Sequence, residues 1–210
     1  MMKLQGYIYI IILSIWSMTS HAVEPYFLSK VPITSGNYYS VFIMDHGKSN
    51  VEDLASMLQF YNPLISDQYA QKIASFYIEE CSDEGVNHDI AFCQMVLETG
   101  FLNYGGSVKK SQNNFCGLGA IGEQVAGEHF PDMQIGVRAH IQHLKAYASK
   151  NDINKESVDK RFRFVERGVA TTIYGLPGKW ASDPLYDEKI EGLLIRLFAH
   201  RSLMASRATF

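Results

Sequence analysis

The segment between Asn87 and Glu98 puts the strongest constraint on how this chain can fold. Its apolar residues recur at helical spacing and make a wide stripe: Ile90, Phe92, Cys93, Val96 and Leu97. A stripe of this width is typical of a helix that is buried on most sides. Such a helix needs other helices around it, and Asn87 or Asp89 can cap its start. The sequence therefore predicts a mainly α domain built around this segment.

Two further helices are predicted before this segment, from the same spacing of apolar residues. One begins at a capping box formed by Ser49 and Glu52, and it stops before Pro63. The other is capped by Ser66 and ended by Gly85.

The C-terminal half combines helices with a glycine-rich stretch. Helices are expected at 134–147 and 187–203, and a helix or a partly helical segment at 161–175. Residues 100–133 are rich in glycine and amides, which indicates a loop with a small β-hairpin. No domain boundary is expected within 49–205.

Residues 1–22 have the pattern of a secretory signal peptide, which predicts a secreted or periplasmic protein. Lys3 supplies a positive charge, residues 7–18 are apolar, and the segment ends in a small-x-small cleavage pattern. The alternative is an uncleaved anchor, although the apolar run is short for a membrane span. No membrane span is expected after cleavage, and residues 23–48 are expected to form an extended arm.

Charge and cysteine content narrow the function classes. The chain has 210 residues and a formal net charge of −3, so it lacks the basic footprint of a nucleic-acid binder. The mixed basic and aromatic run at 160–167 is therefore interpreted as a solvated face. The chain contains three cysteines, which allow at most one disulfide, and Cys93 fits the apolar stripe as a core residue.

Glu98 stands at the end of the buried helix, followed by the helix-breaking pair Thr99-Gly100. A carboxyl at the border between core and solvent loses hydration, which raises its pKa. An acid that is still protonated near neutral pH can donate a proton to a leaving oxygen, as glycoside hydrolysis requires. The alternative is a solvated glutamate of the kind that is common near helix ends.

The turn Asn113-Asn114-Phe115 also has two interpretations. Neighbouring amides suit sugar hydroxyl and acetamido groups, because each amide offers donors and an acceptor. Asparagine is equally a common turn residue.

Histidines in the C-terminal half raise the question of a metal site, since paired histidines on one helix face can bind zinc. The residues concerned are His129, His140 and His143. No third ligand follows at a suitable spacing, and the helix at 134–147 has a strong core stripe. Neither a metal nor a cofactor is therefore expected.

Three motifs in the same order resemble the peptidoglycan N-acetylglucosaminidases of glycoside hydrolase family 73. They are QMVLETGFL (94–102), NNFCGLG (113–119) and WASDPLYDEKI (180–190). The family's patterns are close to QxxLESGWG, NNLFGIK and YATDPxYAxKI. The resemblance extends from Asp67 to Leu197. It implies that residues 49–210 form one lysozyme-like domain, mainly α, with a small β-hairpin lobe beside an active-site cleft.

The resemblance also implies a reaction, the hydrolysis of the β-1,4 bond after N-acetylglucosamine in peptidoglycan. Glu98 takes the general-acid position, and Tyr186, which matches a tyrosine that lines the cleft, is expected among the catalytic residues. Trp180 stands where the family usually has tyrosine, where it would keep an aromatic platform for a sugar, and Phe101 stands where the family often has tryptophan. The residues expected to contact the glycan strand are Gln94, Phe101, Asn113, Asn114, Phe115 and Trp180.

A second carboxylate is expected in the β-lobe, after the asparagine turn. Glu128 is favoured over Glu123 and Asp132, because it falls on the expected return strand. The substrate's own acetamido group is the alternative.

Two other functions stay open on the sequence. One is a lytic transglycosylase of the same fold, and the other is a non-catalytic peptidoglycan-binding protein. The expected partner in each case is the glycan strand, with no nucleic acid, and the protein is expected to be a monomer.

Overall fold

The computed structural model describes residues 39–106, 108–120 and 127–207. The predicted signal peptide at 1–22 and most of the predicted arm at 23–48 lie outside these ranges. The end of the arm that is described belongs to the folded core, because Ile43 is fully buried. The backbone N–H of Ile43 donates to the carbonyl of Thr171 at 3.0 Å, and its carbonyl accepts from Asn87 at 2.8 Å.

The first helix, α1 (Val51–Tyr61), begins one residue later than the predicted capping box. Asn50 is the N-cap: its side chain accepts from the N–H of Asp53 at 2.8 Å, and Asp53 accepts from the N–H of Asn50 at 3.0 Å. The prediction of Ser49 with Glu52 was wrong by one position. Asparagine is as good an N-cap as serine, and Asp53 completes the box from the third helical position.

The next two helices begin and end near the predicted residues. α2 (Asp67–Glu84) is capped by Ser66 and ends at Gly85, whose φ of 71° lies in the left-handed region that favours glycine. α3 (His88–Thr99) is capped by the side chain of Asn87, which accepts from two backbone N–H groups of the first turn.

Two long helices close the fold. α4 (Met133–Ala148) and α5 (Tyr186–Arg207) confirm the predictions at 134–147 and 187–203. Between them, the segment expected to be partly helical contains two short 3-10 turns, η3 (Phe162–Phe164) and η4 (Ile173–Gly175). None of the helices in the described ranges is long and apolar enough to cross a membrane.

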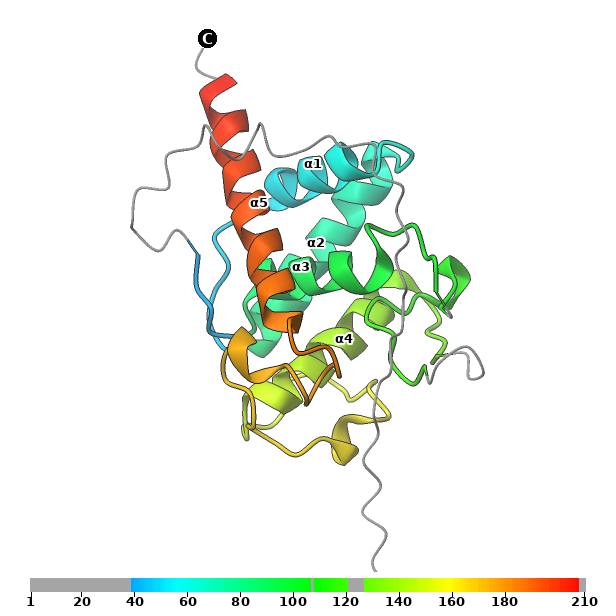
Figure 1. Cartoon of the computed structure of the whole chain (residues 1–210). Helices are drawn as coiled ribbons and strands as arrows, with labels where there is room; N and C mark the ends of the chain where they lie inside the picture. The colour runs from blue at the N-terminus through cyan, green and yellow to red at the C-terminus, as the bar shows by residue number, and fades with distance from the viewer. Residues whose placement is uncertain (1–38, 107, 121–126, 208–210) are drawn as a thin grey trace, which may run out of the picture.

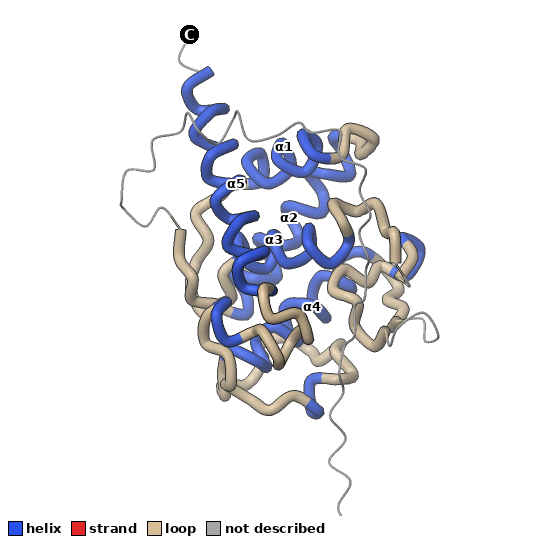
Figure 2. The backbone as a smooth tube through the Cα atoms, in the orientation of Figure 1, coloured by secondary structure: helices blue, strands red, loops and turns tan. Residues whose placement is uncertain are grey.

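Helix α3 lies in the middle of the molecule (Figure 1), where it packs against α2, α4 and α5. Every residue from Asp89 to Val96 is buried, as the wide apolar stripe predicts. The last turn of α3 emerges from this core and carries Glu98 to its edge. The mainly α prediction is confirmed, with helices joined by loops throughout the described part (Figure 2).

The predicted β-hairpin is not confirmed. The described residues of the glycine-rich stretch, 100–106, 108–120 and 127–132, form loops and one 3-10 turn, η2 (Lys110–Gln112), with no strand. Candidate Glu123 lies outside the described residues.

The two flanks of the predicted hairpin are nevertheless connected. The N–H of Phe130 donates to the carbonyl of Gln112 at 2.9 Å, and the N–H of Glu128 donates to the carbonyl of Leu118 at 2.7 Å. Further carbonyls in the flanks accept from side-chain amides instead of a backbone ladder; the Nε2 of Gln112, for example, donates to Gly127 at 2.9 Å. Backbone hydrogen bonds and side-chain amides together therefore connect the described flanks, without a regular strand.

Buried ion pairs fix α4 against α2. The Nζ of Lys145 lies 2.7 Å from the Oε2 of Glu84, and both side chains are almost completely buried. Glu80 accepts from Arg138 at 2.9 Å and lies 3.2 Å from the Nζ of Lys155. A charge buried without a partner is very unfavourable, so these pairs strongly restrict how the two helices can pack.

Candidate active site

Glu98 is partly buried at the C-terminal end of α3, and one of its carboxyl oxygens is held by two donors. The indole Nε1–H of Trp180 donates to Oε1 at 3.0 Å, and the hydroxyl of Tyr186 donates to the same oxygen. Trp180 lies in the loop before α5, and Tyr186 is the first residue of that helix. The first and third sequence motifs therefore meet at this carboxyl group.

Burial raises the pKa of Glu98 from 4.5 to about 7. The hydrogen bonds from Tyr186 and Trp180 lower this pKa, because they stabilise the ionised form, but the loss of hydration outweighs them. The raised pKa agrees with the expectation for a carboxyl at the border of the core. Near neutral pH the group can both give up and take back a proton, which is the property of a general acid and base.

The backbone reverses directly after Glu98 through an unusual turn. Gly100, Phe101 and Leu102 all have positive φ values, of 55°, 56° and 61°. The left-handed region is unfavourable for residues with a Cβ, and such strain is often found at functional sites. The turn is stabilised by the amide of Asn62, whose Nδ2 donates to the carbonyl of Phe101 at 2.7 Å.

Phe101, an expected glycan contact, lies on this turn. It is partly buried, and its ring packs against Tyr61 with 4.7 Å between centroids. The strained turn thus places Phe101, three residues after the acid, against the ring of Tyr61 at the end of α1.

Gln94 differs from its expected role as a glycan contact, because its side chain is fully buried. Its Nε2 donates to the hydroxyl of Tyr186 at 3.0 Å, and its Oε1 lies 2.9 Å from the Nε2 of His140. The Nδ1 of His140 is in turn 2.8 Å from the hydroxyl of Tyr77. The sequence reasoning missed Tyr77 and weighed His140 only as a metal ligand; the one usable signal was that Gln94 lies one turn before Glu98.

Trp180 also differs from its expected role, since it does not offer an open ring face to a sugar. Only 2% of its surface is exposed. Aromatic rings surround it, with centroid distances of 5.8 Å to His140, 5.2 Å to His143 and 5.4 Å to Tyr147. Where the family usually has a phenol, Trp180 supplies an indole N–H that reaches Glu98.

The asparagine turn is built into the fold. The Oδ1 of Asn114 accepts from the N–H of Leu118 at 2.9 Å, and its Nδ2 donates to the carbonyls of Leu118 and Glu128. Asn114 and Phe115 are fully buried, so they shape the turn and do not face a ligand. Asn113 is partly exposed, and its Nδ2 donates to the carbonyl of Phe130 at 3.1 Å.

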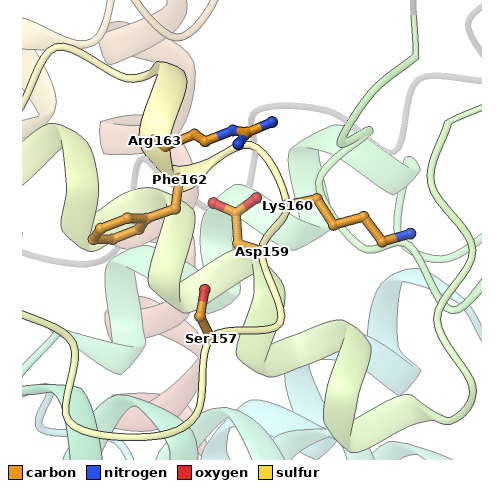
Figure 3. A pocket seen from close by; sticks show the side chains of 5 residues that line it. All are labelled: Ser157, Asp159, Lys160, Phe162 and Arg163. Carbon is orange, nitrogen blue, oxygen red and sulfur yellow. The ribbon is translucent and has the colours of Figure 1, made fainter.

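The favoured second carboxylate, Glu128, is paired with a lysine. Its Oε2 lies 3.2 Å from the Nζ of Lys160, which lines a hollow of about 440 Å³. Figure 3 shows this hollow, with Lys160 pointing away from Phe162; the lining residues are Ser157, Asp159, Lys160, Phe162 and Arg163. Glu128 thus belongs to this charged surface, and the donors that hold Glu98 belong to the loop before α5 and to α5 itself.

Among the described residues, no group of three or more histidine, cysteine or acidic side chains is arranged to hold a metal ion. His140 is engaged with Gln94 and Tyr77, and the Nδ1 of His143 lies 2.7 Å from Asp159. The three cysteines are free thiols in buried positions: Cys81, Cys93 and Cys116.

A family model described as mannosyl-glycoprotein endo-beta-N-acetylglucosaminidase matches residues 74–197, more than half of the chain. This chain belongs to the glucosaminidase family. It is therefore a glycoside hydrolase, and the matched range of this glucosaminidase contains Glu98, Trp180 and Tyr186.

Two known proteins are similar to this glucosaminidase. An uncharacterized protein of Borreliella burgdorferi is 46% identical over 164 residues, which cover 78% of this chain and 80% of that protein. A crystal structure of S. aureus autolysin E in complex with the muropeptide NAM-L-Ala-D-iGlu is 14% identical, with a TM-score of 0.47. That comparison covers 77% of this chain and 72% of the autolysin chain.

Proposed function

We propose that this glucosaminidase is an exported peptidoglycan hydrolase that cleaves the β-1,4 bond after N-acetylglucosamine, with Glu98 as the general acid. The observation that carries the proposal is the environment of Glu98. Burial brings its pKa to about 7, so a large share of the protein holds a transferable proton at neutral pH.

The two oxygens of Glu98 have different tasks in this mechanism. Trp180 and Tyr186 both donate to Oε1, which makes Oε1 the acceptor oxygen and leaves Oε2 to carry the proton. Oε2 protonates the glycosidic oxygen as the bond to the anomeric carbon breaks. The carboxylate that results is stabilised by the same two donors, because hydrogen bonds to an ionised acceptor are stronger than those to a neutral one.

The positive charge that develops on the sugar requires a second group. We assign this part to Glu128 or to the acetamido group of the substrate. A Glu128→Gln variant separates the two: a loss of about 100-fold or more in rate supports the carboxylate. Full activity assigns the support to the acetamido group.

The glycan strand is proposed to run past Phe101 and Asn113, which are both partly exposed. An aromatic ring offers an apolar face to a sugar, and the amide offers a donor and an acceptor. Trp180 and Gln94 act from behind the acid instead of touching the sugar.

The test is digestion of purified peptidoglycan with the full-length protein, followed by reducing-end analysis and mass spectrometry. The proposal expects new N-acetylglucosamine reducing ends, and no new ends from a Glu98→Gln variant. Products lighter by one water, with a 1,6-anhydro end, would show a lytic transglycosylase. Glycan binding without new ends would show a non-catalytic binder.

A further inference from the structure

A continuous chain of hydrogen bonds leads from Tyr77, which is fully buried, to Glu98. It starts at Tyr77 on α2, passes through His140 on α4 and Gln94 on α3, and reaches Tyr186 on α5. The distances are 2.8 Å, 2.9 Å and 3.0 Å, and the hydroxyl of Tyr186 then donates to Glu98. Four helices contribute to one line of polar groups, although the core around it is apolar.

Which partner donates in each of these hydrogen bonds follows from Trp180, which also contacts Glu98 and whose indole N–H can only donate. Because Trp180 donates to Oε1 of Glu98, that oxygen is an acceptor, and the hydroxyl of Tyr186 donates to it as well. The oxygen of Tyr186 is then free to accept from the amide of Gln94, whose Oε1 faces His140.

The remaining links are fixed in the same way. Since the Oε1 of Gln94 can only accept, the Nε2 of His140 carries the hydrogen and donates to it. The Nδ1 of a neutral His140 is then an acceptor, which the hydroxyl of Tyr77 satisfies. Every polar atom along the line has a partner, so a single polarity runs from Tyr77 to Glu98.

We propose that Tyr77, His140 and Gln94 are positioning residues that act through Tyr186 on the carboxyl group of Glu98. This proposal rests on the proposed role of Glu98 as the acid. The amide of Gln94 keeps the hydroxyl hydrogen of Tyr186 directed at Glu98. It also strengthens that donor, because hydrogen bonds in a chain polarise one another.

The surroundings keep this polarity fixed near neutral pH. Burial and the neighbouring His143 lower the pKa of His140 to about 3, so its imidazole stays neutral. The titratable groups that face Glu98 are Tyr186 and the buried thiol of Cys116, whose pKa values are both raised by burial. Neither group ionises near neutral pH, where Glu98 titrates.

The test is the pKa of Glu98 itself, measured by carboxyl ¹³C NMR titration of the protein without substrate. Removing the hydroxyl in Tyr186→Phe is expected to raise this pKa by about 1 to 2, because a hydrogen bond to the charged form is lost. Gln94→Met keeps the side-chain length and is expected to raise it by roughly 0.1 to 0.7. The alkaline limb of the pH profile of kcat/KM should move to higher pH by the same amounts.

The decisive comparison is the double variant. If Gln94 acts through Tyr186, Gln94→Met should leave the pKa of Glu98 unchanged in a Tyr186→Phe background. A rise of equal size in both backgrounds, or no rise in either, overturns the proposal. If Gln94→Met does not fold, Tyr77→Phe takes its place in this comparison. It removes a single hydroxyl at the far end of the chain, and it is expected to raise the pKa of Glu98 by less.

A matched control is Tyr39→Phe, which also deletes one hydroxyl, here bonded to Glu191 at 3.0 Å outside this chain. It should leave the pKa of Glu98 unchanged. The NMR result does not depend on hydrolysis. If the variants change the pKa of Glu98 as expected but the parent protein cuts no glycan, the positioning chain is supported and the proposed function is refuted. Hydrolysis by the parent without any shift in the variants would refute the positioning chain alone.

Discussion

Replacing Glu98 by glutamine should stabilise the protein above neutral pH while it abolishes catalysis. Glutamine keeps an Oε1 acceptor for Trp180 and Tyr186 but carries no proton to donate and no charge to bury. General acid catalysis contributes about 10²- to 10⁴-fold, so at least that loss of activity is expected. The gain in stability comes from removing an ionised group from a site with little water.

The size of this gain follows from the pKa of Glu98, which rises from 4.5 to about 7 on folding. Between these values the native state binds more protons than the unfolded state, so stability falls as the pH increases. Below pH 4.5 the carboxyl is neutral in both states, and the penalty is absent. Above pH 7 the penalty is complete, at about 3 kcal/mol for this difference in pKa.

Urea denaturation of both proteins from pH 4 to pH 8 measures this effect, because contributions from other groups cancel in the difference. Glu98→Gln should match the parent at pH 4 and exceed it by about 3 kcal/mol at pH 8, or by about 6 to 12 °C in Tm. Glu128→Gln is the control, since it removes only a surface ion pair worth about 1 kcal/mol or less. A difference between Glu98→Gln and the parent that stays flat with pH, or grows towards acid, would refute this reasoning.

Three other predictions follow. Trp180→Phe should move the alkaline limb of the pH profile of kcat/KM to higher pH, by about 1 to 2 pH units, because one hydrogen bond to the ionised acid is lost. A move of this limb to lower pH would contradict the prediction. Gly136→Ala should destabilise the protein by about 2 kcal/mol or more in urea, although alanine favours helices, because the new Cβ would lie 1.8 Å from the carbonyl oxygen of Asn113. Lys145→Met should cost about 3 to 5 kcal/mol in thermal unfolding, since Glu84 stays buried without its cation.

The helices could be predicted because their signals are local. Ser66, Gly85 and Asn87 cap or end helices where the sequence indicates, and the wide stripe of α3 requires a central position. The environment of Glu98 could be predicted for the same reason. Its place at the end of a buried helix determines its burial, and its burial determines the direction of its pKa shift.

The supporting residues could not be predicted, because their contacts join positions far apart in the chain. Tyr77 and His140 are 63 residues apart, and His140 and Gln94 are 46 apart. In sequence, an asparagine that binds a sugar is indistinguishable from one that holds a turn, and Asn114 does the latter. The need for Gly136 likewise appears only once Asn113 is seen against α4.

The balance of forces at Glu98 explains why tryptophan can stand where the family usually has tyrosine. A general acid must release its proton and later recover it, so its pKa should lie near the working pH. Desolvation alone can raise the pKa of a buried glutamate to about 8 or 9. At such a pKa the group recovers its proton easily, but the release of the proton is unfavourable. Donors to the ionised form lower the value again, and any N–H or O–H of suitable geometry serves that purpose. For the proposed role of Glu98, position 180 therefore requires a donor to Oε1, which the indole supplies, together with a shape that the rings of His143 and Tyr147 can enclose.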